Sequence, residues 1–263
     1  MSRLTELSRS VAGARVVVTG AASGMGRATA HLFADEGAMV VVADLTSDGV
    51  ARVVSEIEGM HGPGRAVGSV VDVSVPEDRS RLVSLSVDSF GGLDVLVNNA
   101  GISRVSSVFS DDATFGENWD RTLSVNLSAH AHLIRAALPH LLSAPHGGRV
   151  INIASTEAIV ATGGLAAYTA SKHGVVGLTK SFAVELGARN VTVNAVCPGP
   201  IDTGMTAGVP EDKRGKYVRR KVPLRRYGAP EEVAHMTVTL AMPAMRFMTG
   251  SVVVVDGGLV VNH

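Results

Sequence analysis

Short runs of apolar, mostly β-branched residues alternate along the chain with longer segments in which apolar residues recur at helical spacing. The short runs are apolar at consecutive positions, which is typical of parallel strands covered on both faces. The longer segments have the period of amphipathic helices. The pattern predicts strands at 15–19, 38–43, 66–73, 93–98, 148–154, 191–197 and 251–255, and helices at about 25–36, 47–59, 76–90, 114–142, 166–188 and 230–241.

Repeated strand–helix–strand units with right-handed crossovers predict an α/β fold, a doubly wound Rossmann-type parallel sheet of about seven strands with helices on both faces. No low-complexity linker or short repeat divides the 263 residues, a length that one α/β domain can reach. We therefore expect residues 1–263 to form a single domain. The long connection at about 203–227, after the sixth strand, is expected to be a substrate lid.

Composition excludes several classes of protein and of site. Basic and acidic residues number 24 each, so no overall charge favours nucleic acid or an anionic membrane as a partner. Cys197 is the only cysteine, which excludes an internal disulfide and a cysteine-rich zinc site, and we expect a buried thiol. No apolar run is long enough to span a membrane, and the N-terminus lacks a signal-peptide core. We infer a cytoplasmic protein that needs no metal.

A glycine-rich turn, Thr19-Gly-Ala-Ala-Ser-Gly-Met-Gly26, joins the first predicted strand to the first helix. Its glycines are spaced G-x-x-x-G-x-G rather than in the commoner G-x-G-x-x-G. Gly20, Gly24 and Gly26 permit positive φ and a close approach of the backbone, which leaves amide groups and the helix dipole to face a pyrophosphate. A plain tight turn is the alternative, but the position at the first strand–helix junction favours a dinucleotide site.

Asp44 closes the second predicted strand, about 20 residues beyond the glycine-rich turn. A carboxylate there can accept hydrogen bonds from both ribose hydroxyls of an adenosine and repels a 2′-phosphate. No lysine or arginine is adjacent to Asp44, and Ser23 precedes Gly24. These features predict NAD rather than NADP, with a helix cap or a solvated strand end as the alternative for Asp44.

Polar residues also follow the third and fourth predicted strands. Asp72, with Val73, can place a carboxylate near an adenine amino group or only cap the next helix. The sequence Asn98-Asn-Ala-Gly101 suits a sheet end that a ribose approaches, or a simple turn. Asn126 interrupts a helical pattern in which an isolated asparagine is unfavourable. Its amide either bends the helix and holds a water near Lys172, or faces solvent.

Tyr168 and Lys172 are four residues apart at the start of a long helical pattern, so both lie on one helix face. An ammonium near a phenol favours the phenolate, which lowers the pKa of the tyrosine. Such a tyrosine can exchange a proton with an alcohol or a developing alkoxide. Ser155, at the end of the fifth strand, can hydrogen-bond the same substrate oxygen. Taken alone, the spacing favours an ordinary surface pair, because such pairs are common on helices.

In this order and on these predicted elements, the motifs resemble those of the short-chain dehydrogenase/reductase family. The resemblance runs from about residue 15 to residue 258 and includes Pro198-Gly-Pro-Ile-Asp-Thr203 and Asp256-Gly-Gly258. It implies a catalytic tetrad in which Tyr168 is the acid–base residue and Ser155 polarises the substrate oxygen. Lys172 would hold the nicotinamide ribose, and Asn126 would position a water in a proton relay. The family also implies a homotetramer.

The resemblance further implies that Thr203 and the Ile201 backbone contact the nicotinamide carboxamide. The substrate oxygen is expected to meet Ser155 and Tyr168. The full set of expected cofactor-binding residues is Gly20, Ser23, Gly24, Met25, Gly26, Asp44, Leu45, Asp72, Val73, Asn99, Ala100, Gly101, Tyr168, Lys172, Pro198, Gly199, Ile201 and Thr203.

Substrate choice is expected to depend on the lid. Residues 211–226 carry eight basic and two acidic side chains. They form either a solvated helical face or a docking patch for an acidic partner such as acyl carrier protein or coenzyme A. An apolar wall would suit a hydrophobic, alicyclic or steroid-like secondary alcohol, and its expected residues are Ile102, Val105, Val160 and Met205.

The sequence thus predicts an NAD-dependent oxidoreductase acting on a secondary alcohol/ketone pair. A 3-oxoacyl-thioester reductase is the second enzyme candidate, which the basic lid favours and Asp44 disfavours. A dinucleotide-sensing binding protein without catalysis is the third candidate, and the intact pair of Tyr168 and Lys172 argues against it.

Overall fold

A seven-stranded parallel sheet forms the centre of the computed structural model, which describes residues 6–262. Its order is β3-β2-β1-β4-β5-β6-β7, and each neighbouring pair is parallel. The predicted doubly wound sheet is therefore confirmed. The strands are β1 (Arg15–Thr19), β2 (Met39–Asp44), β3 (Ala66–Val70), β4 (Val95–Asn98), β5 (Gly148–Ile153), β6 (Val191–Pro198) and β7 (Val252–Val255).

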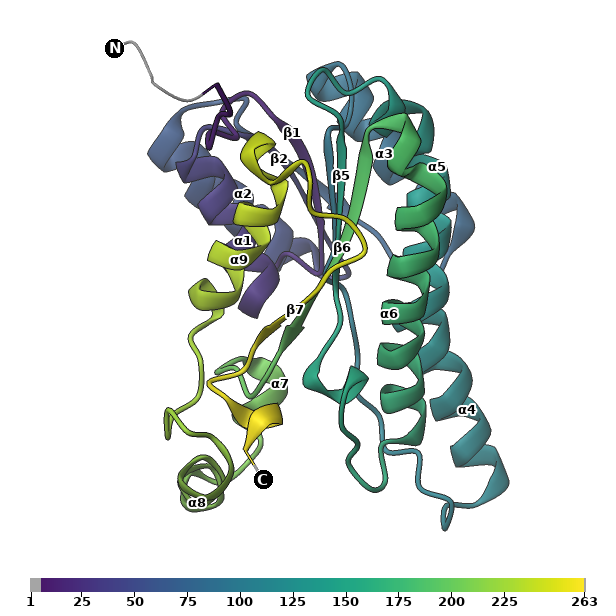
Figure 1. The fold of residues 1–263 in the computed structure, drawn as a ribbon. Helices are drawn as coiled ribbons and strands as arrows, with labels where there is room; N and C mark the ends of the chain where they lie inside the picture. The colour runs from purple at the N-terminus through teal and green to yellow at the C-terminus, as the bar shows by residue number, and fades with distance from the viewer. Residues whose placement is uncertain (1–5, 263) are drawn as a thin grey trace.

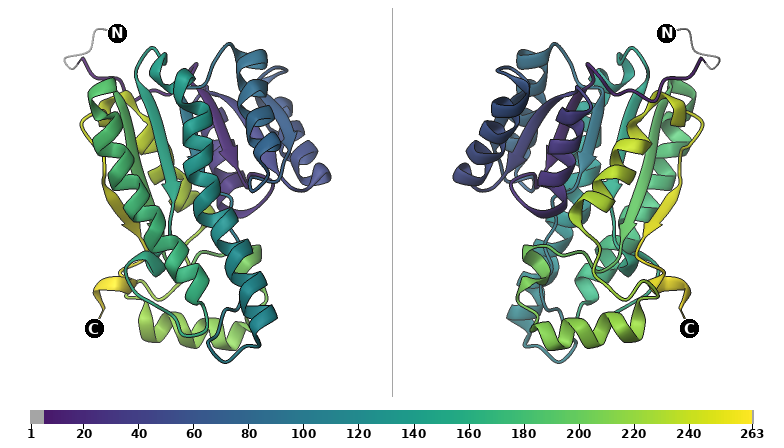
Figure 2. Two further views of the ribbon diagram at one scale, coloured as in Figure 1. Left: turned by 90° about the vertical axis from the view of Figure 1, so that its right-hand side faces the viewer. Right: turned by 90° about the vertical axis from the view of Figure 1, so that its left-hand side faces the viewer.

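Helices cover the sheet on both faces (Figure 1). Figure 2 shows each helical layer in front of the strands. A hydrophobic core lies on each face of the sheet, and alternate residues of β1 pack into one or the other. Val16 and Val18 pack on the α1 side and Val17 on the α5 side. Burial on both faces explains why the strands are apolar at consecutive positions. One layer is α1 (Gly24–Asp35), α2 (Ser47–His61) and α9 (Pro230–Ala241), and the other is α3 (Pro76–Phe90), α5 (Ala129–Leu142) and α6 (Ala166–Leu186).

The helix expected over 114–142 is divided in the structure. It consists of α4 (Asp112–Leu123), a π-helical turn (Ser124–Ser128) and α5. Asn126 lies in the π turn and is fully buried, with its Oδ1 accepting from the Ile102 amide and its Nδ2 donating to the Ile102 carbonyl, both at 2.9 Å. The amide thus binds a neighbouring loop while the helix widens by one residue, which confirms the local distortion and excludes the solvent-facing alternative.

β3 ends at Val70, three residues before the predicted end of the strand. The amide of Asp72 donates to the Asp78 carboxylate at 2.7 Å instead of continuing the ladder with β2. The chain therefore turns into α3 earlier than its apolar residues suggest, because a side chain of the next helix takes the backbone donor.

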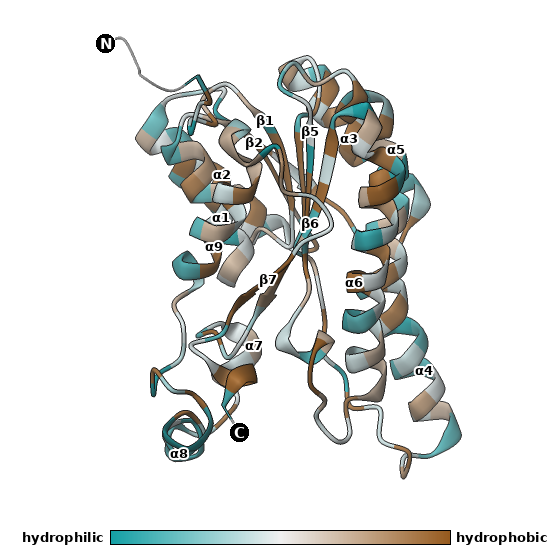
Figure 3. Ribbon diagram, in the orientation of Figure 1, coloured by the Kyte–Doolittle hydropathy of each residue, from teal (hydrophilic) through white to brown (hydrophobic). Residues whose placement is uncertain are grey.

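The segment between β6 and α9 contains two helices, α7 (Gly204–Ala207) and α8 (Glu211–Lys221). Both lie beyond the carboxyl ends of the strands, and α8 is the most uniformly hydrophilic helix of Figure 3. Arg214 attaches α8 to the body of the protein, since its guanidinium lies 2.6 Å from Asp202 and 4.3 Å from the centre of the Tyr227 ring. Val218 is buried on the inner side of the same helix.

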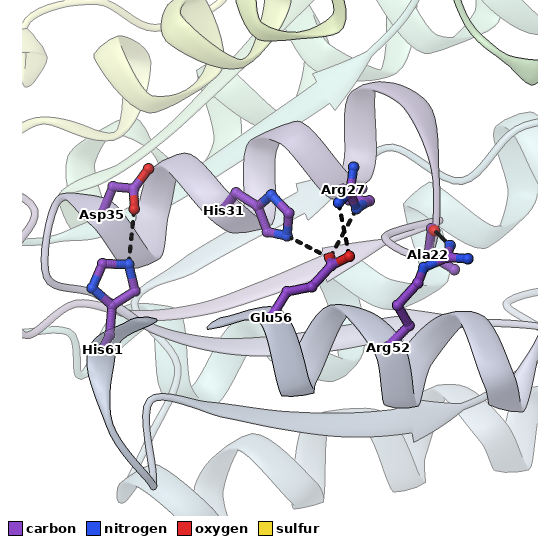
Figure 4. A network of polar contacts seen from close by, with 7 residues as sticks. All are labelled: Ala22, Arg27, His31, Asp35, Arg52, Glu56 and His61. Carbon is purple, nitrogen blue, oxygen red and sulfur yellow. Dashed lines mark hydrogen bonds and ion pairs between the residues drawn. The ribbon is translucent and has the colours of Figure 1, made fainter. Parts of the chain in front are cut away.

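Polar contacts join α1 to α2 beside the glycine-rich turn (Figure 4). Glu56 accepts two hydrogen bonds from Arg27, at 2.8 and 2.9 Å, and lies 3.0 Å from His31 Nε2. Arg52 donates to the Ala22 carbonyl at 2.9 Å. These contacts hold the turn that leads into α1 against the second helix.

Candidate active site

A cavity of about 340 Å³ opens at the carboxyl ends of β1, β2 and β4. Its walls come from segments far apart in sequence, namely the glycine-rich turn, the ends of β2 and β3, residues 99–102 and residues 203–205. It brings together all the expected cofactor-binding residues except Tyr168, Lys172, Pro198, Gly199 and Ile201. This is the edge at which open parallel sheets bind ligands.

The glycine-rich turn can accommodate a pyrophosphate. Gly20 and Gly24 have φ of +65° and +52°, and a Cβ on Gly26 would lie 2.0 Å from the Gly20 carbonyl oxygen. Ser23 precedes α1 and its side chain makes no capping hydrogen bond within the described chain, while the first turn of α1 has no acidic residue. The amide groups at this helix end therefore face the cavity without a competing side chain or negative charge.

Asn99 fixes the wall opposite the turn. Its Nδ2 donates to the carbonyls of Thr19 at 2.8 Å and of Gly20 at 3.1 Å. The Thr19 hydroxyl in return accepts from the amides of Asn99 and Ala100. Asn99 thus shapes the cavity by binding the backbone of the first turn.

Asp44 is held by backbone amides at the cavity wall. Its two carboxylate oxygens accept from Ala22 N at 3.0 Å and from Leu45 N at 2.7 Å. The residue that caps α2 is Thr46, so the helix-cap alternative for Asp44 is wrong. The carboxylate is oriented before any ligand binds.

Asp72 both lines the cavity and organises the turn before α3. It accepts from the Ser74 amide at 2.9 Å and hydroxyl at 2.6 Å, and pairs with Arg121 at 2.8 Å. Burial raises the pKa of Asp72, but the hydrogen bonds from Ser74 and Arg121 outweigh it and bring the pKa below its ordinary value. Among residues 6–262, Arg121 is the one basic side chain at this cavity. Sequence analysis missed it because nothing local on α4 indicates a partner at the end of β3.

The structure brings Ser155, Tyr168 and Lys172 together at the end of β5. Lys172 Nζ lies 5.7 Å from the centre of the Tyr168 ring and donates to the Ile153 carbonyl at 2.8 Å. The Ser155 hydroxyl accepts from the Glu157 amide at 3.1 Å and is near enough to Tyr168 to lower the pKa of its phenol. Lys172 is buried, whereas Ser155 and Tyr168 are partly exposed.

Asn126 and Lys172 both lie next to Gly101. A Cβ on Gly101 would lie 3.5 Å from Asn126 Oδ1 and 3.6 Å from Lys172 Nζ. Asn126 Nδ2 also donates to the Ser171 hydroxyl at 3.2 Å, which links the π turn to α6. The four expected catalytic residues therefore converge at one edge of the sheet, next to the cavity.

The pKa shifts correct one expectation. Burial lowers the pKa of Lys172 to about 8. Burial also raises the pKa of Tyr168, with the hydrogen bond from Ser155 opposing the rise and the Glu157 carboxylate adding to it. The expected lowering of the Tyr168 pKa is therefore wrong. Desolvation of the phenol has the largest effect on that pKa and raises it. Cys197 is buried as expected, and burial raises the pKa of its thiol.

Glu157 is a site residue that sequence analysis missed. Its carboxylate accepts from the Thr162 amide and hydroxyl, at 3.0 and 2.6 Å, and from the Thr169 hydroxyl at 2.7 Å. It therefore ties the loop after Ser155 to the first turn of α6. Its position two residues after Ser155 was the available signal.

Only part of the expected apolar wall lines the cavity. Ile102 and Met205 do, whereas Val105 and Val160 do not and are 62% and 41% exposed. Both valines lie on loops, where the fold rather than the local sequence decides which side faces a ligand.

Comparisons with known proteins define the class. Residues 20–260 match the family model described as "Enoyl-(Acyl carrier protein) reductase". The chain is 40% identical to the 3-oxoacyl-[acyl-carrier-protein] reductase of Thermotoga maritima, covering 93% of this chain and 97% of that one. It is 37% identical to the cyclohexanol dehydrogenase of Acinetobacter sp. (strain SE19), covering 92% of each. A solved short-chain dehydrogenase/reductase from Mycobacterium marinum is 33% identical, with a TM-score of 0.87 over 95% of this chain and 97% of that one.

The fold and these relatives define an oxidoreductase of the kind that acts on hydroxyl and keto groups. The chain belongs to the short-chain dehydrogenase/reductase family, which uses a nicotinamide cofactor.

Two further properties of residues 6–262 concern membranes and metal ions. Within them no helix combines the length and the apolar character that crossing a bilayer requires. The same residues hold no group of three or more histidine, cysteine or acidic side chains placed to bind one metal ion.

Proposed function

We propose that the protein transfers a hydride between NAD and a hydrophobic secondary alcohol or ketone. Two of its relatives support an alicyclic substrate. The observation that carries this proposal is the convergence of Ser155, Tyr168 and Lys172 beside a cavity lined by the glycine-rich turn. A phenol, a hydroxyl and an ammonium at one place can move a proton to or from a substrate oxygen.

The catalytic roles follow from these contacts. Tyr168 takes the proton of an alcohol, or gives one to the oxygen of a ketone, while Ser155 orients that oxygen. Lys172, anchored on the Ile153 carbonyl, would hold the nicotinamide ribose. Asn126, fixed by Ile102, faces Lys172 across Gly101 and positions the relay water. The bound nicotinamide supplies the hydride acceptor or donor.

The remaining roles concern the cofactor. The glycine-rich turn would hold the pyrophosphate, and Asp72 with Val73 would contact the adenine. Thr203, at the cavity wall, would bind the carboxamide together with the backbone of the Pro198–Ile201 segment that connects β6 to the lid. Each of these residues lies at the carboxyl edge of the sheet, where a dinucleotide extends across the switch point between β1 and β4.

Asp44 supports NAD over NADP. Its carboxylate is fixed by two amides at the cavity wall, where it would meet the ribose hydroxyls of the adenosine and repel a 2′-phosphate. Arg121, the basic side chain at the cavity among residues 6–262, is engaged by Asp72 and Ser74. A 2′-phosphate would therefore find an anion rather than a free cation.

An alicyclic substrate is supported by two relatives. One is the cyclohexanol dehydrogenase, and the other is the trans-4-hydroxycyclohexanecarboxylate dehydrogenase of Sinomonas cyclohexanicum, which is 40% identical over 97% of this chain and 96% of that one. Ile102 and Met205 provide apolar surface at the cavity for such a ring.

A 3-oxoacyl-thioester reductase is the second candidate. The reductase of Thermotoga maritima supports it, as does the surface of α8, where Arg219, Arg220 and Lys221 are exposed. An acidic carrier would dock on such a surface by charge complementarity. Asp44 argues against this candidate for a reductase that uses NADPH, because the carboxylate would repel the 2′-phosphate of that cofactor.

A homotetramer is the proposed assembly. β7 is one of the two edge strands of the sheet, with Val254 37% exposed, and Val184 on α6 is 86% exposed. Apolar side chains at a sheet edge and on a neighbouring helix suit contacts between copies. Sedimentation of the purified protein tests the assembly.

The function is tested by the absorbance of reduced nicotinamide. The protein is mixed with NAD⁺ and a panel of secondary alcohols, including cyclohexanols, and then with NADP⁺ and the same panel. A further assay mixes it with NADH or NADPH and a 3-oxoacyl thioester. Turnover of alicyclic alcohols with NAD⁺ is expected. Turnover only with NADPH and a 3-oxoacyl thioester would select the second candidate, and NAD binding without turnover on either panel would select a dinucleotide-sensing protein.

A further inference from the structure

Ala22, in the glycine-rich turn, is bound on one side by Asp44 and on the other by helix α2. Its amide donates to Asp44 Oδ2 at 3.0 Å, and its carbonyl accepts from Arg52 Nη2 at 2.9 Å. Figure 4 shows Arg52 reaching Ala22 from α2. Asp44 lines the cavity, whereas Ala22 and every residue of α2 do not. Arg52 therefore supports the cavity wall from outside.

α2 also packs closely against Ala22. Gly49 is buried on α2 three residues before Arg52, so the two lie on the same side of the helix. A Cβ on Gly49 would lie 2.7 Å from the Ala22 Cβ and 2.6 Å from Thr46 Oγ1. Both distances are too short for non-bonded atoms, so any side chain at position 49 would displace Ala22 or Thr46.

The two amides that hold Asp44 differ in what fixes them. Asp44 Oδ1 accepts from the amide of the next residue, Leu45, at 2.7 Å, and this contact is local to the chain. The Ala22 amide belongs to a distant segment, and its position depends on how the glycine-rich turn packs against α2. The direction in which Asp44 Oδ2 points therefore depends on Gly49 and Arg52.

The charge of Arg52 would by itself have the opposite effect on cofactor choice. The Arg52 guanidinium lies at most about 10 Å from Asp44 Oδ2, because one residue, Ala22, joins the two groups. A cation at that range attracts a 2′-phosphate, to an extent that salt reduces. A direct effect of its charge therefore favours NADP, whereas orientation of the Asp44 carboxylate favours NAD.

We propose that Arg52 and Gly49 are positioning residues that set the preference for NAD through Ala22 and Asp44. They keep the Ala22 amide in the place from which it directs the Asp44 carboxylate toward the adenosine ribose. This inference rests on the proposed function in its assignment of Asp44 to that ribose.

The test measures the dissociation constants of NADH and NADPH without substrate, by the fluorescence of the bound nicotinamide. In Arg52→Leu we expect the affinity for NADH to fall about threefold more than that for NADPH, within the range that one hydrogen bond contributes. An equal loss for both dinucleotides would show only a loosened turn, and a larger loss for NADPH would show a direct charge effect. Either result would overturn the proposal. Arg189→Leu, at an exposed position outside the cavity, is the matched control and should change neither constant.

Gly49→Ala tests the same support without removing a charge. Because Ala22 or Thr46 must move, the ratio of the two affinities should narrow as in Arg52→Leu. Gly59→Ala, on the same helix with no atom within 4 Å of its added Cβ, should leave the ratio unchanged. An unchanged ratio in a folded Gly49→Ala would contradict the role of Gly49. Arg52 is exposed, so Arg52→Leu is expected to fold even if Gly49→Ala does not.

A double-mutant cycle shows whether Arg52 acts through Asp44. Once Asp44→Ala has removed the carboxylate, Arg52→Leu should narrow the ratio no further. An equal narrowing with and without Asp44 would overturn the proposal. The titrations need no turnover, so the two proposals can fail separately. A protein that shows these binding ratios and oxidises no alcohol would refute the proposed function and leave the roles of Arg52 and Gly49 standing.

Discussion

Lys172 Nζ lies 5.7 Å from the centre of the Tyr168 ring, one turn away on α6, and is anchored on the Ile153 carbonyl at 2.8 Å. Burial acts on the two groups in opposite senses, lowering the pKa of Lys172 to about 8 and raising that of Tyr168. Burial therefore favours the neutral form of each. Neighbouring groups either oppose the effect of burial on the pKa of Tyr168 or add to it. They therefore decide the pH range in which Tyr168 exchanges a proton.

Replacing Tyr168 by phenylalanine should remove the acid–base group and leave the shape of the site unchanged. We expect kcat to fall by about 10³-fold, within the range that general acid–base catalysis contributes. Dinucleotide affinity, measured by fluorescence titration, should stay within about twofold, since the hydroxyl makes few of the cofactor contacts. Retained turnover would contradict the role assigned to Tyr168.

Removing the charge of Glu157 should shift the pH profile. Its carboxylate helps to raise the pKa of Tyr168, so in Glu157→Gln that pKa should fall. Alcohol oxidation requires the phenolate, and its acidic limb should therefore move to lower pH. Ketone reduction requires the phenol, and its activity should be lost at a lower pH than in the wild type. Glu157→Asp retains the charge and serves as the control, and an equal shift in both variants would show that loop geometry is the cause.

Asp44→Ala should reduce the preference for NAD over NADP. Loss of a carboxylate that repels a 2′-phosphate is expected to narrow the ratio of kcat/KM values by about tenfold, which corresponds to about 1.4 kcal/mol. Asp48→Ala, on the exposed start of α2 and outside the cavity, is the control. If the Asp44 variant rejects NADP⁺ as strongly as before, another feature sets the preference.

Gly26→Ala should disrupt the glycine-rich turn. The added Cβ would lie 2.0 Å from the Gly20 carbonyl oxygen, so the backbone that faces the pyrophosphate must move. We expect weaker dinucleotide binding and a free energy of unfolding lower by about 1–3 kcal/mol, as for overpacked sites. Gly59→Ala on α2 meets no atom within 4 Å and should stabilise the helix by about 0.5–1 kcal/mol. Chemical denaturation and dinucleotide titration of both variants make the comparison.

Neutralising the exposed basic end of α8 tests the second candidate function. In the triple variant Arg219→Gln, Arg220→Gln and Lys221→Gln, the KM for a substrate linked to acyl carrier protein should rise about tenfold if the helix docks an acidic carrier. The KM for a small alcohol should not change, which provides the internal control. An unchanged KM for the carrier-linked substrate would leave α8 as a solvated surface.

The periodic features of the chain were the most predictable. Strands such as β1 and β2 are apolar at consecutive positions because both of their faces are covered, so the sequence pattern follows directly from the layered fold. The glycine-rich turn and Asp44 were also predictable, since they lie at ends of strands where a parallel sheet binds its ligand. The boundaries of β3 and of the helix around Asn126 were not predictable, because they depend on contacts with other segments. The Asp78 carboxylate takes the Asp72 amide, and the Asn126 side chain binds the backbone of Ile102.

The order of strands and helices, the place of the site at the carboxyl edge of the sheet and the pairing of Tyr168 with Lys172 were determined by the sequence, because each depends on local periodicity or spacing. The tertiary structure alone decided which distant groups surround that pair. Glu157 and Arg121 act through neighbours brought to them by folding, and the sign of the Tyr168 pKa shift depends on burial. Desolvation and charge act over a few ångströms in space, and separation along the chain does not report that distance.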